Sequence, residues 1–154
     1  MRLERAMNYF FGPHLLHNSQ IFFESQLSIG IVNLKPIVPG HVLVIPKRVE
    51  PRLMSLTSEE YLDLFSTARI IAPRIEEHYQ AEAMNVAIQD GVAAGQSVPH
   101  VHIHILPRKR GDFQRNDDVY EELEKQQLQE AFNPTQRKVR SVQEMSTECD
   151  KLRG

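Results

Sequence analysis

Three histidines at every second position make the segment 97–107, SVPHVHIHILP, the strongest structural constraint in the chain. In a β-strand successive side chains point to opposite faces, so His100, His102 and His104 share one face. The apolar residues between them are β-branched, which favours a strand. The pattern therefore predicts a strand over residues 100–106 with one face of imidazoles and one apolar face for the core.

Four further segments have the composition of strands, and two have the apolar period of helices. Strands joined mostly by short turns, with helices inserted between some of them, predict an α+β domain. Its centre would be a five-stranded antiparallel sheet with two main helices. The predicted strands are 20–25, 27–34, 41–45, 83–90 and 100–106, and the predicted helices are 57–79 and 117–131.

Local signals mark where these elements begin, bend and end. Thr57 and Glu60 have the spacing of a capping box, which starts the first helix. Pro73 lies inside that helix and removes one backbone donor, which predicts a kink near Ala72.

The chain after the second helix is polar. Ser141 and Glu144 repeat the capping-box spacing, but few apolar residues follow, so a short helix and disorder are both open for this tail. The predicted organisation is one domain at 1–132, with an N-terminal extension at 1–9 and a mobile loop at 107–117, and a tail at 133–154.

Charge and cysteine content exclude several classes of protein. The chain has 154 residues and a net charge of −2, so no basic surface for nucleic acid or membranes is expected. Cys149 is the single cysteine, which excludes an internal disulfide and fits a reducing compartment. No apolar run approaches the roughly 18 residues of a membrane helix, and the first 20 residues make a poor signal peptide. We expect a protein of the cytoplasm, or of the cytoplasm and nucleus.

The alternating histidines allow three interpretations: the polar face of a half-buried strand, a metal site, or a nucleophile with helpers. Zinc binds imidazole at about 2.0–2.1 Å, so two histidines at i and i+2 could share one ion. The outer pair is about 13 Å apart at Cα, and a third ligand would have to come from elsewhere, such as His41 or Asp90. No pair of cysteines and no HExxH motif accompanies the run.

A nucleophilic histidine is the interpretation that we favour, because neutral imidazole has a free lone pair at neutral pH. The other histidines would then lie along a chain of phosphates and donate hydrogen bonds where charge develops. The loop before the strand supports this interpretation. Gly91, Gly95 and the small residues around them let backbone N–H groups approach phosphate oxygens closely.

These residues also resemble a known family. HVHIHIL, residues 100–106, is similar to the H-x-H-x-H-x-x signature of the histidine triad superfamily of nucleotide hydrolases and transferases. FGPHLL, SIGIVNLKPIVPGHVLVIP, IQDGVAAGQSVPHVHIHILPRKRGDF and NDDVYEEL extend the resemblance over about residues 10–130. LPRK-x-GDF followed by ND-x-x-YEEL favours the fragile histidine triad branch, the dinucleoside polyphosphate hydrolases.

The resemblance implies a histidine triad fold whose sheet joins that of a second subunit in a homodimer. It implies cleavage of diadenosine triphosphate (Ap3A) to AMP and ADP through a covalent nucleotidyl-histidine that water then hydrolyses. His102 is then the nucleophile, His104 contacts the attacked phosphate, and His100 orients and polarises His102. No tightly bound cofactor or metal site is expected; Mg²⁺ or Mn²⁺ would arrive with the substrate phosphates, and neither nucleic acid nor a membrane is an expected partner.

Other residues match the family pattern one at a time. His14 and Asn33 match residues that hold the nucleotide, with Asn33 at the ribose. Gln89 matches the polar residue near the bridging oxygen, where it would assist the leaving group or the attacking water, and His41 would support the histidine cluster. Tyr120 matches a regulatory phosphorylation site. The residues that match the phosphate-binding loop are Gly95, Gln96, Ser97 and Val98.

The chain departs from the pattern in three places. Pro99 stands where we expect a basic residue, Pro73 interrupts the long helix, and the tail beyond about residue 132 matches nothing. Two alternatives stay open. GQSV-x-HVH-x-H is shared with the nucleoside phosphoramidate hydrolases of the sister branch, and a nucleotide-dependent signalling or binding protein would use the same pocket. The choice between three and four phosphates is open as well.

Overall fold

The computed structural model describes the backbone of residues 7–132 and 139–154, and the side chains of 7–125 and 139–154. Five strands form one antiparallel sheet in the order β3-β4-β5-β7-β6, which confirms the predicted α+β fold. Two further strands form a separate hairpin. The strands are β1 (Phe10–Phe11), β2 (His14–Leu15), β3 (Ile21–Glu24), β4 (Ser28–Val32), β5 (Val42–Pro46), β6 (Ala83–Ile88) and β7 (Ile103–Arg108).

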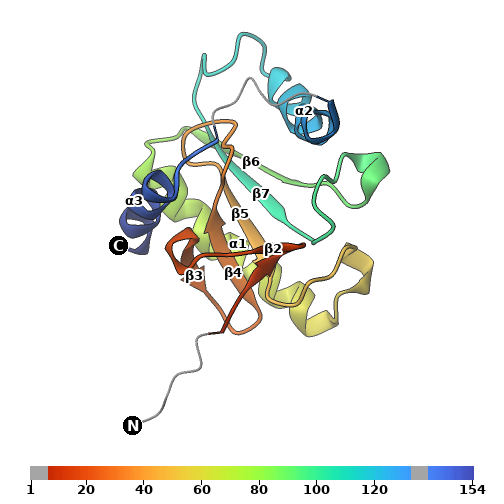
Figure 1. Ribbon diagram of the computed structural model, residues 1–154. Helices are drawn as coiled ribbons and strands as arrows, with labels where there is room; N and C mark the ends of the chain where they lie inside the picture. Colours follow the sequence, from red (N-terminus) through yellow and green to blue (C-terminus); the bar gives the residue numbers. More distant parts are fainter. Residues whose placement is uncertain (1–6, 133–138) are drawn as a thin grey trace.

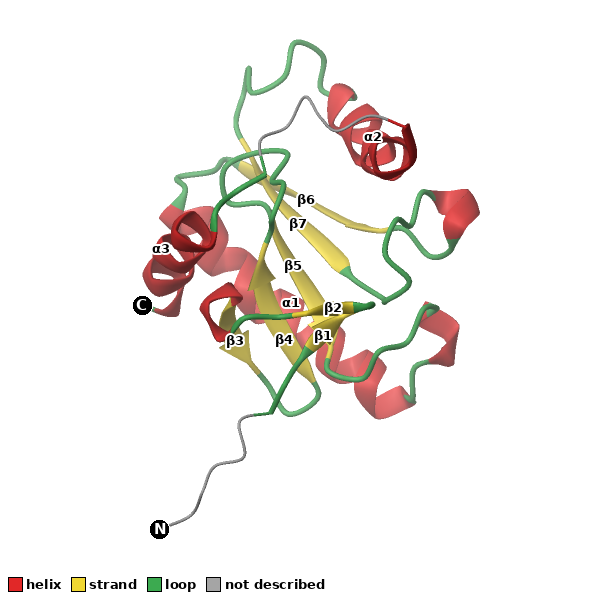
Figure 2. Ribbon diagram, in the orientation of Figure 1, coloured by secondary structure: helices red, strands yellow, loops and turns green. Residues whose placement is uncertain are grey.

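The helices flank the faces and edges of the sheet. The helix α1 covers one face of the sheet, and the β1–β2 hairpin lies over the other face (Figure 1). Figure 2 shows α2 beside the β6 edge and α3 near the β3 edge. In the described residues the helices are α1 (Ser58–His78), α2 (Asp118–Phe132) and α3 (Val142–Arg153), with 3₁₀ turns η1 (Asn18–Gln20), η2 (Leu53–Ser55) and η3 (Val92–Ala94).

The face of the sheet toward α1 holds the main core. Val44, Ile103 and Ile105 alternate toward this face and pack with Leu64 and Ile71 of α1 in one buried cluster. Fully burying an aliphatic side chain of this size contributes roughly 1.5–3 kcal/mol. The apolar half of the alternating segment is therefore in the core, as the sequence predicts.

The opposite face carries the histidines. His104 in β7 pairs with Leu43 in β5 and with Ala87 in β6, and directly opposed residues of antiparallel strands point to the same face. Leu43 in turn pairs with Ile31. Next to His104, this face is therefore apolar.

Both predicted bounds of this strand are wrong: β7 begins at Ile103 and not at residue 100, and it ends at Arg108, inside the loop predicted at 107–117. The pairing of Ile103 with Val44 is the last one to β5. Before it the chain turns away, because the Val101 N–H donates to the Glu50 carbonyl at 2.7 Å. His100 and His102 therefore lie on an irregular segment that enters β7.

The capping boxes are present at both predicted helix starts. Thr57 and Glu60 exchange side-chain and backbone hydrogen bonds of 2.9 and 3.1 Å at the start of α1, which then continues past Pro73 to His78. Ser141 and Glu144 do the same for α3.

The tail therefore forms a helix where its sequence left helix and disorder open. Met145, Cys149 and Leu152 bury one stripe of α3 in the core that α1 and the sheet share. Residues 133–138 of the predicted tail, and 1–6 of the predicted N-terminal extension, lie outside the described residues.

Candidate active site

Four histidines meet on the sheet face opposite α1. His100 and His102 precede β7, His104 lies in it, and His41 directly precedes β5. All four are at most 4% exposed. The rings of His102 and His104 have centroids 4.8 Å apart, and those of His41 and His104 are 5.2 Å apart. The structure thus brings together the three histidines of the alternating run and the fourth that sequence placed beside them.

Two backbone groups fix the proton of His100. The Gly12 N–H donates to Nδ1 at 3.0 Å, and Nε2 lies 2.8 Å from the Pro46 carbonyl oxygen. Because a carbonyl only accepts, we assign the proton to Nε2. Gly12 has a φ of 55°, and a Cβ there would lie 2.6 Å from Val98 Cγ1, so the turn of the β1–β2 hairpin requires glycine.

The carbonyl of His100 in turn fixes His102. His102 Nδ1 lies 2.7 Å from that oxygen, so Nδ1 carries the proton and Nε2 keeps its lone pair. The rings of Phe11 and His102 meet edge to face, with centroids 5.1 Å apart. Burial lowers the pKa of His102 to about 4, more than the hydrogen bond to the His100 carbonyl raises it. At neutral pH His102 is therefore a neutral, oriented imidazole.

A chain of hydrogen bonds assigns the opposite tautomer to His104. The Ile37 N–H donates to His41 Nδ1 at 3.1 Å, so the proton of neutral His41 is on Nε2. That Nε2 donates to His104 Nδ1 at 2.9 Å, which leaves the His104 proton on Nε2. His104 Nε2 is buried and has no hydrogen-bond partner among the described residues. A buried, unused N–H beside an imidazole lone pair is a donor for a ligand oxygen.

In the predicted phosphate-binding loop, backbone N–H groups that sequence suggests for a ligand donate to carbonyls of the loop itself. Gly91 and Gly95 flank η3 with φ angles of 100° and 88°. The Gly95 and Gln96 N–H groups donate to carbonyls inside the loop, at Val92 and Gly91. The Gln96 amide accepts from the Gly91 N–H and donates to the Pro51 carbonyl, both at 2.8 Å. Gln96 therefore holds the loop in shape.

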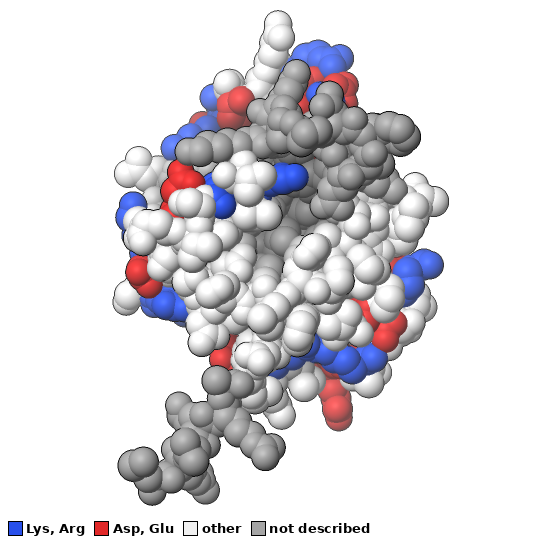
Figure 3. Space-filling model, viewed as in Figure 1, with Lys and Arg blue, Asp and Glu red and all other residues white. Residues whose placement is uncertain are grey.

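A cavity of about 390 Å³ adjoins the histidine cluster and brings together four predicted site residues, His14, Asn33, Ser97 and Val98. The face that carries the β1–β2 hairpin is hollowed near its centre, and white, uncharged residues form the lower border of the hollow (Figure 3). An apolar cavity with a few polar groups is the usual form of a small-molecule site. Its apolar wall includes Phe11, Leu15, Leu16, Ile31, Leu43 and Met145.

Asn33 is buried at the polar end of this cavity. Its Oδ1 accepts from the Lys35 N–H at 2.9 Å, which orients the amide. Its Nδ2 lies 3.3 Å from His41 Nε2, where two donors meet, and 3.4 Å from His41 Nδ1, which is the acceptor nitrogen in this tautomer.

Two predicted residues lie at the margins. Gln89 directly follows β6 and is half-buried. Tyr120 on α2 is 49% exposed, and its hydroxyl accepts a 3.4 Å hydrogen bond from the Asn85 amide. Among the described residues, no group of three or more His, Cys, Asp or Glu side chains is placed to hold a metal ion. No described helix is long and apolar enough to cross a membrane.

Sequence reasoning missed Phe11 and Met145 as cavity residues. Phe11 lies within the FGPHLL motif, directly before Gly12, and this position was a usable signal. Met145 comes from the tail that matched nothing. Its spacing of four and seven residues to Cys149 and Leu152 is the helical signal that could have found the stripe.

The buried imidazoles predict a stability that falls in acid. The unfolded chain takes up a proton at His102 near pH 6.5, and the folded protein does so only near pH 4, so stability rises with pH across this interval. Between pH 7.5 and pH 5, wild type should lose about 2 kcal/mol more of its free energy of unfolding than His102→Gln. Urea denaturation of both proteins at both pH values measures this. Equal losses would show that His102 is not held neutral by burial.

Comparison with known proteins agrees with this geometry. A family model described as the HIT domain matches residues 16–111. A bis(5'-adenosyl)-triphosphatase from Dictyostelium discoideum is 49% identical over 144 residues, 94% of this chain and 90% of that protein. An asymmetrical bis(5'-nucleosyl)-tetraphosphatase from Schizosaccharomyces pombe is 59% identical over 107 residues, 70% of this chain and 59% of that protein.

A solved structure shares the fold over almost the whole chain. The Plasmodium falciparum diadenosine triphosphate hydrolase, crystallised with cyclomarin A, superposes with a TM-score of 0.78 and 27% identity. The match covers 99% of this chain and 86% of that one. The chain belongs to the HIT family of histidine triad proteins, in its fragile histidine triad branch.

Proposed function

We propose that the protein is a hydrolase that cleaves diadenosine triphosphate to AMP and ADP. The triphosphatase name of the Dictyostelium relative, which aligns over 94% of this chain, supports the substrate. The observation that carries the chemistry is the state of His102. Its Nδ1 proton is bound to the His100 carbonyl, and its Nε2 lone pair is free at neutral pH.

The reaction would proceed in two displacements. Nε2 of His102 attacks the α-phosphorus, the bond to the bridging oxygen breaks, and ADP leaves. Water then attacks the same phosphorus, the P–N bond breaks, AMP leaves, and a water proton passes to solvent. A covalent intermediate divides one difficult displacement into two easier ones. The His100 carbonyl would stabilise the positive charge that His102 gains when its Nε2 is bonded.

The neighbouring groups have roles that follow from their protons. His104 Nε2–H would donate to a non-bridging oxygen of the attacked phosphate, where negative charge grows. His41 would keep the proton on that nitrogen. Gln89, at the end of β6, would assist the leaving group or the water. Mg²⁺ or Mn²⁺ would accompany the phosphates, whose oxygens are the ligands that Mg²⁺ prefers.

The nucleoside would occupy the cavity beside the cluster. Its apolar wall suits a base, and Asn33 and His14 lie at its polar side for the ribose. Ser97 and Val98 would line the path from the nucleoside to the phosphates.

We also propose a homodimer that pairs along β6. This strand lies at the edge of the sheet, and Val86 in it is 57% exposed. An unpaired edge offers a row of backbone donors and acceptors to another chain. Sedimentation equilibrium would give twice the chain mass, and a monomer at micromolar concentration would remove this proposal. For the compartment we propose the cytoplasm, with or without the nucleus, which suits the single buried thiol of Cys149.

Product analysis with three substrates tests the proposed function. Diadenosine triphosphate, diadenosine tetraphosphate and adenosine phosphoramidate are each incubated with wild type and with His102→Ala. We expect the triphosphate to be cleaved fastest, with AMP and ADP in equal amounts. A preference for the tetraphosphate would move the assignment to the activity in the name of the Schizosaccharomyces relative. A preference for the phosphoramidate would move it to the sister branch, and no turnover would leave a binding protein.

A further inference from the structure

Arg140, two residues before α3, binds the backbone of two residues that line the cavity. The Arg140 N–H donates to the Leu34 carbonyl at 3.0 Å, and its Nε and Nη2 donate to the Asn33 carbonyl at 3.0 and 2.5 Å. Asn33 and Leu34 directly follow β4 and line the cavity. Arg140 thus holds this backbone by three hydrogen bonds from a position 107 residues later in the chain.

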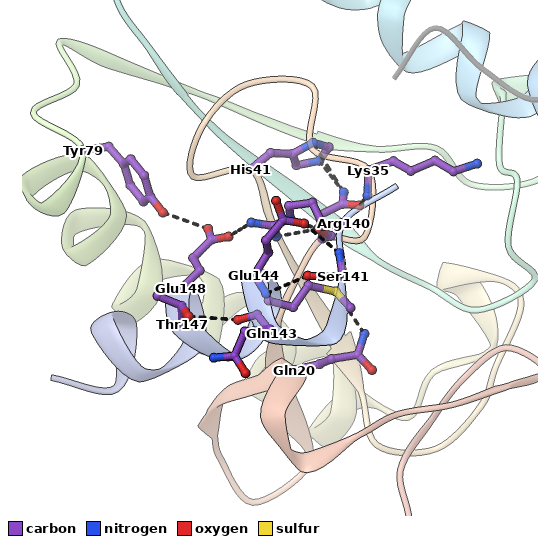
Figure 4. Close-up of polar contacts among 12 residues, drawn as sticks. Gln20, Lys35, His41, Tyr79, Arg140, Ser141, Gln143, Glu144, Thr147 and Glu148 are labelled. Carbon is purple, nitrogen blue, oxygen red and sulfur yellow. Dashed lines mark hydrogen bonds and ion pairs between the residues drawn. The ribbon is translucent and has the colours of Figure 1, made fainter. Parts of the chain in front are cut away.

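The other edge of the Arg140 guanidinium is held just as firmly. Its Nη1 is paired with the Glu148 carboxylate on α3, and Glu148 also accepts from the Tyr79 hydroxyl at 2.8 Å (Figure 4). Burial, and then the charge of Glu148, raise the pKa of Tyr79, so its hydroxyl stays a donor. The planar fork of arginine can reach a carboxylate and a carbonyl at once, and the single ammonium of lysine cannot reproduce that geometry.

The first turn of α3 also reaches the cavity itself. Met145 is buried, lines the cavity beside Leu34, and receives a 3.6 Å contact on its sulfur from the Gln20 amide. A thioether is polarisable and packs well against an aromatic ring. Met145 of α3 therefore lines the same cavity as Asn33 and Leu34, whose backbone Arg140 holds.

We propose that the segment 140–145, which leads into α3, is part of the nucleotide-binding site. Arg140 is a positioning residue that holds Asn33 against the ribose, and Met145 is a binding residue that packs on the base. This inference rests on the proposed function, because it assumes an adenine nucleotide in the cavity. The C-terminal segment then contributes to ligand affinity, which the histidine pattern does not predict.

The chain provides a matched control for Arg140. Arg153 lies at the end of α3, the helix that Arg140 precedes by two residues, and it also donates to backbone carbonyls, at Asn18 (2.6 Å) and Ile21 (2.7 and 3.0 Å). Arg153→Lys therefore weakens the anchoring of α3 in the same way but leaves Asn33 alone. Binding of AMP and of 2′,3′-dideoxy-AMP, measured by calorimetry, reports on the ribose contact.

We expect wild type to bind AMP about tenfold more tightly than the dideoxy analogue, the value of a well-placed neutral hydrogen bond. In Arg140→Lys this preference should fall below about threefold, and in Arg153→Lys it should be unchanged. For diadenosine triphosphate, Arg140→Lys should raise KM about tenfold and leave kcat within about threefold, because the histidines are untouched.

Met145 has its own control. Leu152 is buried in the same core on the same helix but does not line the cavity. Met145→Ala should weaken AMP binding about tenfold, and Leu152→Ala should leave it unchanged when circular dichroism shows both variants folded.

The outcomes separate the inference from the function. If Arg140→Lys and Arg153→Lys weaken AMP and its dideoxy analogue alike, Arg140 only supports the fold and the positioning role is wrong. If Met145→Ala binds AMP as wild type does, the base contact is wrong. A wild-type protein that neither binds AMP nor cleaves the triphosphate would remove the proposed function itself.

Discussion

Replacement of His102 by alanine should lower kcat for diadenosine triphosphate by about 10⁴-fold or more, the usual cost of deleting a nucleophile. The size of the effect follows from the protons of the neighbouring rings. His100 Nε2 donates to the Pro46 carbonyl. His104 Nε2 carries a proton, because His104 Nδ1 accepts from His41. Neither neighbour therefore presents a second lone pair to the phosphorus.

The same substitution should leave nucleotide binding nearly intact, because the cavity wall does not include His102. Calorimetry with AMP should give an affinity within about threefold of wild type, and steady-state assays give kcat. His78→Ala, at the exposed end of α1, controls for the loss of an imidazole and should keep full activity. A His102→Ala protein with a near-normal kcat would show that another group attacks.

Replacement of His104 by alanine should lower kcat by about 10²–10³-fold, the range for losing one preorganised donor to a developing oxyanion. The Nε2–H of His104 is buried and unused among the described residues, so its hydrogen bond would form with the substrate. The donation should strengthen as charge grows on the phosphate oxygens, and KM should therefore change much less than kcat.

His104→Gln is the matched variant, because its side-chain amide can place an N–H near the position of the imidazole Nε2. It should recover at least about tenfold of the rate that alanine loses. Single-turnover rates from rapid-quench experiments measure both variants free of product release. Equal rates for the alanine and glutamine variants would contradict the donor role. A rate for the alanine variant within tenfold of wild type would contradict it as well.

The alternating histidines predict their common face because that prediction needs only the two-residue period of an extended chain. They cannot predict that β7 begins at Ile103, because the cause is a long-range hydrogen bond from Val101 to Glu50. Nor can they predict which ring nitrogen carries each proton. That depends on the backbone of Gly12, Pro46 and Ile37, which only the fold brings near.

The loop that contains Gln96 and the C-terminal tail show the same limit of prediction from sequence. A glycine-containing loop with a glutamine suggests groups that face a ligand, but the Gln96 amide is used on both sides by backbone. Arg140 reaches Asn33 across 107 residues, and no local period reports such a contact. Sequence proposes which residues carry the chemistry, and the fold decides which of them line the cavity and which hold others in place.

The covalent intermediate on His102 is the central claim, and the stereochemistry at phosphorus tests it most directly. A diadenosine triphosphate made chiral at the α-phosphorus with sulfur and oxygen isotopes is hydrolysed, and the configuration of the AMP product is determined by NMR. Each in-line displacement inverts the phosphorus, so two displacements through His102 predict net retention. Net inversion would mean that water attacks the substrate directly, and the nucleophilic role of His102 would be wrong.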